Sequence, residues 1–139
     1  MSNELCVPWE PLPGLIAPCG SVSFSYESPD RLRARLAFSE VIGGVPHDLL
    51  LLFSGVIAAR FESESFGIVP LPNHLPKFST PQWSNWTFPL LQVSSSSWLE
   101  EHVSHNPAAA ERRVHFALIS MNDLLHILAL PEVTAAWCV

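Results

Sequence analysis

Apolar and polar residues alternate along much of the first half of the chain, and this alternation predicts β-strands. Val22, Phe24 and Tyr26 alternate with serines, which is typical of a strand with one buried face. Leu32 and Leu36 alternate with arginines in the same way, and the short turn between the two stretches indicates a hairpin. A third stretch is continuously apolar, as in a strand buried on both faces. The predicted strands cover residues 21–26, 31–38, 48–53 and 56–62, an antiparallel meander within 21–69.

The second half of the chain mixes helix and strand patterns. Ser97 and Glu100 have the spacing of a capping box, which predicts the start of a helix. Ser120 and Asp123 resemble a second helix start, and an apolar helical face follows them. We expect the strands on either side of that second helix to be parallel, joined by a right-handed crossover. The predicted order is strand 90–93, helix 97–105, strand 114–119, a short helix that starts at Ser120 and is ended by Pro131, and strand 133–139.

Residues 70–89 interrupt these patterns with prolines and aromatic side chains. Proline lacks a backbone donor, so this stretch is expected to be a long loop and not a central strand or helix. Residues 1–20 are expected to be an extended lead-in with prolines. The chain is therefore predicted to be one α+β domain, residues 1–139, in which 90–139 holds the later strands and helices. The predicted architecture is a curved antiparallel sheet or partial barrel, with two short helices and a long loop.

Composition narrows the possible partners. Hydrophobic residues make up 48% of the 139 residues and charged residues 14%, which indicates a folded domain. The net charge of −6 disfavours a nucleic-acid backbone or an anionic membrane as the main partner. The amino terminus lacks the basic and apolar regions of a signal peptide, and three widely spaced cysteines suit a reducing compartment. We therefore expect a cytoplasmic protein.

Candidate catalytic and metal-binding patterns are weak. His102 and His105 are three residues apart on the predicted helix and could share a metal ion, with a third ligand from the remaining histidines or glutamates. An ordinary polar helix end explains this spacing as well. Arginines at 31, 33 and 35 could bind an anion, or could pair with Glu27 across the hairpin. Nucleophile-elbow and phosphate-binding glycine motifs are missing from the sequence, so we expect no catalytic residue, metal ion or cofactor.

Aromatic and acidic side chains are the stronger candidates for partner binding. Rings of the 70–89 loop could present large rigid surfaces to a partner, or could close the core between the two halves of the chain. Glu62 and Glu64 alternate at the end of a predicted strand and form an acidic edge. The predicted partner-binding residues are Trp83, Trp86, Phe88, Glu62, Glu64, Glu100 and Glu101.

The end of the chain has a pattern of packing residues made of His115-Phe116, Ser120-Met121-Asn122-Asp123, Ile127-Leu128-Ala129 and Trp137. This pattern is similar to small bacterial cytosolic proteins, some of which are immunity proteins encoded beside polymorphic toxins. The resemblance implies a compact α+β protein that binds and does not catalyse, and it transfers no site residue by position.

These observations lead to one main functional hypothesis and two alternatives. The main hypothesis is a non-enzymatic protein-binding module, specifically an immunity protein that neutralises a toxin with a basic active-site cleft. One alternative is a small-molecule-binding or enzymatic barrel with a pocket lined by Trp and His, favoured if His115 or His126 has a strongly shifted pKa. The other is a structural subunit of a larger assembly.

Overall fold

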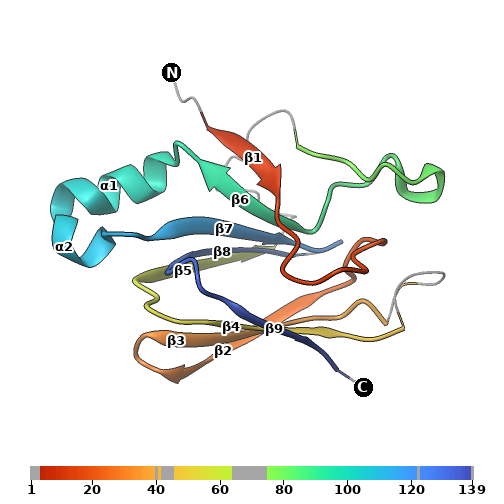
Figure 1. Cartoon of the computed structure of the whole chain (residues 1–139), viewed down its shortest axis with the longest axis horizontal. Helices are drawn as coiled ribbons and strands as arrows, with labels where there is room; N and C mark the ends of the chain where they lie inside the picture. Colours follow the sequence, from red (N-terminus) through yellow and green to blue (C-terminus); the bar gives the residue numbers. More distant parts are fainter. Residues whose placement is uncertain (1–3, 40, 42–45, 64–74, 122, 139) are drawn as a thin grey trace.

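The computed structural model describes residues 4–39, 41, 46–63, 75–121 and 123–138. Within these ranges the chain forms two stacked antiparallel sheets and two short helices, an α+β arrangement (Figure 1). Neither sheet closes into a barrel, because each strand order has two free ends. A two-layer stack therefore replaces the partial barrel. In the described part of the chain, no helix has the length and apolar content that a membrane crossing requires.

The first sheet has five strands that come from both ends of the sequence. Every neighbouring pair in it is antiparallel, and the strand order is β1-β6-β7-β8-β5. The predicted lead-in thus contributes an edge strand of its own. The bounds are β1 Leu5–Pro8, β6 Leu90–Ser94, β7 Val114–Ile119, β8 Asp123–Ala129 and β5 Ala58–Ser63.

The second sheet has four strands in the order β2-β3-β4-β9, again antiparallel throughout. The predicted meander is confirmed for β2 to β4, but the chain then crosses to the first sheet at Gly55. Gly55 has a φ of 61°, and Leu130 packs where its Cβ would lie. The bounds are β2 Val22–Ser28, β3 Arg31–Leu36, β4 Leu49–Phe53 and β9 Thr134–Trp137.

The hydrophobic core lies between the two sheets. Phe53 of β4 and Phe116 of β7 meet across it with ring centroids 5.2 Å apart, and Trp9 lies 4.7 Å from Phe116. Tilted and edge-to-face ring pairs of this kind add roughly 0.5–1.5 kcal/mol beyond their buried area. Leu32 and Leu36 of β3 point into the same core while the arginines between them face solvent. The alternation in the sequence therefore sets the inner face of this strand.

The predicted second helix is wrong, because residues 123–129 form strand β8. β8 pairs antiparallel with β7, and the strand that follows it, β9, lies in the second sheet beside β4. The predicted parallel pair of strands joined by a crossover is therefore wrong as well. Ser120 accepts a hydrogen bond from the backbone N–H of Asp123 at 2.8 Å and stabilises the hairpin turn, where a helix cap was expected. Leu125 and Ile127 face the core, while His126 and Leu128 face the opposite side, and all four are buried. A strand buried on both faces lacks the alternation that would distinguish it from a helix.

Helix α1, Ser97–His105, has the predicted bounds, and α2, Pro107–Ala110, adds one turn. The N-cap is Ser96 and not Ser97, since Ser96 accepts from the N–H of Leu99 at 3.1 Å. Ser95, just before it, has a φ of 53°. Both helices lie at one end of the molecule, and the short 3-10 turn η2, Pro81–Trp83, lies at the other (Figure 1).

The described part of the predicted loop, residues 75–89, folds back on itself. Phe78 and Phe88 are buried with ring centroids 5.2 Å apart, and the N–H of Phe88 donates to the carbonyl of Pro76 at 2.9 Å. Trp83 packs partly against the core, and Trp86 lies on the surface with its ring 6.0 Å from that of Trp83. The loop therefore divides its rings between the core and the surface. Residues 64–74 lie outside the described residues.

Candidate functional site

A chain of buried polar side chains connects α1 to the first sheet. Ser96, His115 and His126 come from the β6–α1 junction, β7 and β8, and all three are buried. Ser96 Oγ lies 2.6 Å from Nδ1 of His115, and Nε2 of His115 lies 2.7 Å from Nδ1 of His126. We call these three residues the Ser–His–His network. It occupies the face of the sheet that points away from the core.

The hydrogen bonds of Ser96 set the direction of the protons through this network. Ser96 Oγ already accepts from the N–H of Leu99, so its hydroxyl proton is best used by donation to Nδ1 of His115. His115 then carries its proton on Nε2 and donates to Nδ1 of His126. His126 in turn carries its proton on Nε2. The network therefore ends in an N–H donor.

That last atom has no hydrogen-bond partner among the described residues. Nε2 of His126 is buried, and a buried donor without a partner costs roughly 1–3 kcal/mol. Trp98 of α1 lies above the two histidines, with its ring 5.2 Å from that of His115 and 6.1 Å from that of His126. Arg60 of β5 is the direct cross-strand neighbour of His126, and its guanidinium carbon lies 5.6 Å from the centre of the Trp98 ring. These contacts surround His126 with an indole and a cation.

Burial makes both histidines weak bases. Desolvation and the neighbouring His126 together lower the pKa of His115 to about 3, although Glu4 acts to raise it. Desolvation also lowers the pKa of His126 to about 4; Glu62 and Glu4 act to raise it, while Arg60 lowers it. Both imidazoles are therefore neutral at pH 7. A neutral pair agrees with the proton direction set by Ser96, since each ring then carries one proton.

A second candidate surface lies where β2, an edge strand of the second sheet, comes close to β5, an edge strand of the first sheet. Phe24 and Tyr26 of β2 point toward the first sheet, yet 38% of Phe24 and 51% of Tyr26 is exposed. Only Val22 on that face is buried, so the expected buried side of this strand is wrong for its outer half. Phe61 of β5, 44% exposed, lies 5.4 Å from Phe24 between ring centroids. We call Phe24, Tyr26 and Phe61 the aromatic edge.

The predicted partner-binding residues do not form one surface. Trp86 is exposed on the loop, whereas Phe88 is buried against Phe78 and offers little surface to a partner. Glu100 and Glu101 are exposed on α1, at the opposite end of the molecule from the loop (Figure 1). Glu62 is half-buried on the α1 side of β5, and Glu64 lies outside the described residues. Trp83 is half-buried and contacts Trp86 on the same loop.

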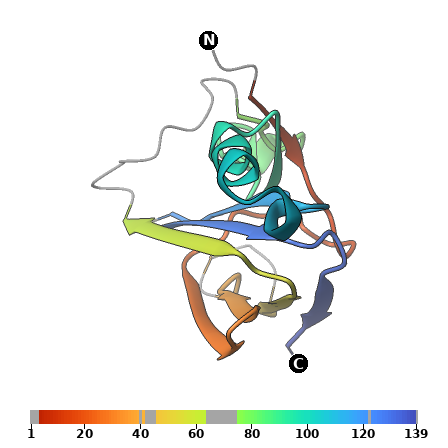
Figure 2. The ribbon, with the colours of Figure 1, turned by 90° about the vertical axis from the view of Figure 1, so that its left-hand side faces the viewer.

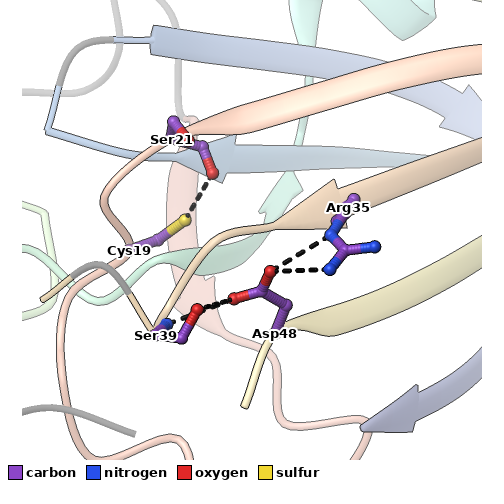
Figure 3. A network of polar contacts seen from close by, with 5 residues as sticks. All are labelled: Cys19, Ser21, Arg35, Ser39 and Asp48. Atoms are coloured by element: carbon purple, nitrogen blue, oxygen red, sulfur yellow. Dashed lines mark hydrogen bonds and ion pairs between the residues drawn. The ribbon is translucent and has the colours of Figure 1, made fainter. Parts of the chain in front are cut away.

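Two of the three arginines on β3 are paired within the protein, as the alternative interpretation predicted for the hairpin. Arg33 forms an ion pair with Glu27, and Arg35 donates from two nitrogens to one oxygen of Asp48 at 3.0 and 3.1 Å. Ser39 donates to the other oxygen of Asp48 at 2.6 Å (Figure 3). Burial acts to raise the pKa of Asp48, but these hydrogen bonds hold it below its usual value. These pairs connect β3 to Glu27 of β2 and to Asp48, which directly precedes β4.

The histidine pair on α1 shows no metal centre. His105 Nδ1 lies 2.8 Å from the carbonyl of Glu101, while the ring of His102 packs on Trp98. In the ranges that the structure covers, no three His, Cys, Asp or Glu side chains gather as metal ligands would. His102 and His105 lie at the end of α1, where an ordinary polar helix end was the alternative, and the histidines that meet are His115 and His126. Their signal was a polar residue in an otherwise apolar strand.

The chain matches no protein-family model, no curated protein and no solved structure.

Proposed function

We propose that the protein is a non-enzymatic binding module that takes up an extended segment of a partner protein at the aromatic edge. The observation that carries this proposal is the contact of Phe24 with Phe61, two exposed rings from different sheets. Aromatic side chains supply large rigid contact areas at small entropic cost, and they often dominate binding energy.

The two strands that carry these rings are sheet edges. β2 and β5 each stand at an end of their strand order, and they lie on the same side of the stack, opposite β1 and β9 (Figure 2). β2 has seven residues and contains neither lysine nor proline, the residues that commonly block an edge. An extended partner segment can add to such an edge through main-chain hydrogen bonds, with its apolar side chains against the rings.

The charge of the protein suits a basic partner. The net charge is −6, and Glu62 follows Phe61 directly in β5. The narrower form of the proposal is an immunity protein whose partner is a bacterial toxin, as the resemblance of the C-terminal segment implies. Trp86 and Trp83, on the loop, remain a separate predicted contact.

The test is binding to the protein encoded beside this one, measured by pull-down and calorimetry. Phe24→Ser and Phe61→Ser should each weaken the complex about tenfold or more, because each removes a large contact from the centre of the edge. Trp86→Ser is the comparison variant, because it removes an exposed ring from the other predicted contact. Loss of binding in Trp86→Ser alone would move the interface to the loop. No measurable complex with any neighbouring gene product would contradict the proposal.

One observation favours a second candidate, a small-molecule site lined by Trp and His. Trp98 meets two histidines of strongly lowered pKa on the α1 side of the first sheet. This arrangement needs no barrel, because α1 and the sheet form its two walls.

A further inference from the structure

We propose that Arg60, Trp98 and His126 form a binding site for a small oxyanion, a carboxylate or a phosphoryl group. In this site Nε2 of His126 donates one hydrogen bond to the oxyanion, Arg60 donates a charged one, and Trp98 packs against the ligand. The site is distinct from the aromatic edge and does not depend on partner binding there.

The unsatisfied atom, Nε2 of His126, is a hydrogen-bond donor. Ser96 directs its proton to His115, and His115 directs its own proton to His126, so the free end of the network is a donor. A donor calls for an acceptor oxygen, and the ligand must bring one. Ser96 and His115 are positioning residues here, because they fix the tautomer of His126 and need not touch the ligand.

Arg60 lies beside His126 on the neighbouring strand. Arg60 and His126 are opposite each other in the β5–β8 register, and side chains directly opposite in a sheet project from the same face. The guanidinium is exposed and stacks on Trp98, so its donors remain close to water. A fork of N–H groups beside a neutral N–H donor suits the two oxygens of a carboxylate or the several oxygens of a phosphoryl group.

Two acidic side chains near His126, Glu4 and Glu62, would repel a bound anion. Glu4 is held at the N-terminus of α1, where it accepts from the N–H of Ser97 at 2.9 Å and from the Ser97 hydroxyl, and this pairing offsets its charge. Glu62 lies two residues from Arg60 on the same strand face and acts on His126 electrostatically. Removing the Glu62 charge should therefore strengthen anion binding.

Nε2 of His126 is buried, so a ligand reaches it only when the elements packed around it open, and α1 with Trp98 is one of these elements. α1 contains no fully buried residue, so it is attached to the sheet mainly through its half-buried side chains and the Ser96 cap. Elements with few buried contacts open locally at small cost. The ring of Trp98 can then move away from the His126 ring and pack against the ligand, so that a contact with the ligand replaces the contact with His126.

The experiment follows the imidazole nitrogens by NMR in histidine-labelled protein at pH 7. Sodium acetate and inorganic phosphate are the two probes, and sodium chloride at equal ionic strength is the control. We expect a saturable shift of the His126 Nε2 resonance with at least one probe and none with chloride. Response to acetate alone identifies a carboxylate site, and response to phosphate alone identifies a phosphoryl site.

Three variants decide the result. Arg60→Gln, at an exposed position, should weaken binding about tenfold or more. Glu62→Gln should strengthen it several-fold, and Lys77→Gln, a charge change in the loop, should leave it unchanged. Melting temperatures confirm that each variant folds.

Three outcomes would overturn the proposal. One is the absence of a saturable shift with both probes, and another is equal affinity in wild type and Arg60→Gln. The last is a shift of His126 Nε2 in ligand-free Glu62→Gln as large as saturation, because the Glu62 carboxylate would then already occupy the site.

Discussion

Nε2 of His115 and Nδ1 of His126 lie 2.7 Å apart on neighbouring strands, so the two rings share one proton in a buried hydrogen bond. Two positive imidazoles cannot occupy this position together. The pair is stable only as neutral rings, and this condition links the stability of the whole fold to pH.

Acid should destabilise the protein well above the range where carboxylates titrate. In the unfolded chain each histidine binds a proton near pH 6.5, but in the folded chain the pKa is about 3 for His115 and about 4 for His126. Between pH 6.5 and about 4 the unfolded state therefore binds more protons. The free energy of unfolding should fall with decreasing pH by up to about 1.4 kcal/mol per pH unit for each histidine.

Urea unfolding at several pH values measures this slope. His126→Leu should reduce it, whereas His47→Gln, an exposed histidine on another part of the chain, should not. Asp48, whose pKa is lowered from 3.8, affects stability only below that window. Glu4, Glu62 and Arg60 surround the pair, so the slope is best compared at fixed salt. An unchanged slope in His126→Leu would show that the pair does not titrate as the structure requires.

Ser96→Ala should cost more stability than an ordinary helix cap. The variant removes the acceptor for the Leu99 N–H and the donor to His115 together, and each loss is worth about 1 kcal/mol or more. Ser95→Gly is the control one residue earlier. Ser95 has a φ of 53°, so glycine there should be neutral or stabilising by up to about 1 kcal/mol.

Thermal unfolding of both variants measures these effects, and NMR of the His115 nitrogens detects a change of tautomer in Ser96→Ala. A purely structural cap would change the melting temperature and leave the tautomer as it is.

Gly55→Ala should destabilise the protein by about 1–3 kcal/mol. An added Cβ would lie 2.6 Å from Cγ of Leu130, and the φ of 61° is unfavourable for alanine. Gly14→Ala separates the two effects, because Gly14 also has a positive φ but its nearest neighbour would be 3.7 Å away. Chemical denaturation of both variants gives the comparison. Equal losses would mean that backbone strain alone matters at Gly55.

The two loop tryptophans should differ in their effect on stability. Trp83 packs partly against the core, so Trp83→Ala should cost about 2 kcal/mol or more. Trp86 is 40% exposed, so Trp86→Ala should cost about 1 kcal/mol, mostly through its contact with Trp83. The double variant gives the coupling between the rings. A larger loss in Trp86→Ala would identify that ring as the one that closes the core.

Sequence patterns correctly predicted elements with one polar and one apolar face, and elements whose ends are marked by polar or capping residues. β7 and α1 have the expected bounds, since one is a bounded apolar run and the other begins beside serines. β8 was mistaken for a helix because α1 and the second sheet bury both of its faces. The signal at Ser120 was real but belongs to a turn, in which the side chain bonds Asp123.

The candidate sites depend on contacts that the sequence does not reveal. Ser96 and His115 are 19 residues apart, and His115 and His126 are 11 apart, so neither spacing matches a local motif. Their alignment follows from the β7–β8 register and from the place where α1 begins. Phe24 and Phe61 meet only because the chain changes sheets at Gly55.

That change of sheets also has a consequence for folding kinetics. β1 pairs with β6, with Leu5 opposite Ser94, β5 pairs with β8, with Ala58 opposite Leu128, and β4 pairs with β9, with Leu49 opposite Trp137. In the part of the chain that the structure describes, the other four pairings, within β2–β3–β4 and β6–β7–β8, join strands that are consecutive in sequence. Each distant pairing must close a large loop before its contacts repay the entropy, and domains with many non-local strand pairings fold on a millisecond-to-second scale. We therefore expect this small domain to fold slowly, with the exposed rings of β2 and β5 open to wrong partners until the two sheets have joined.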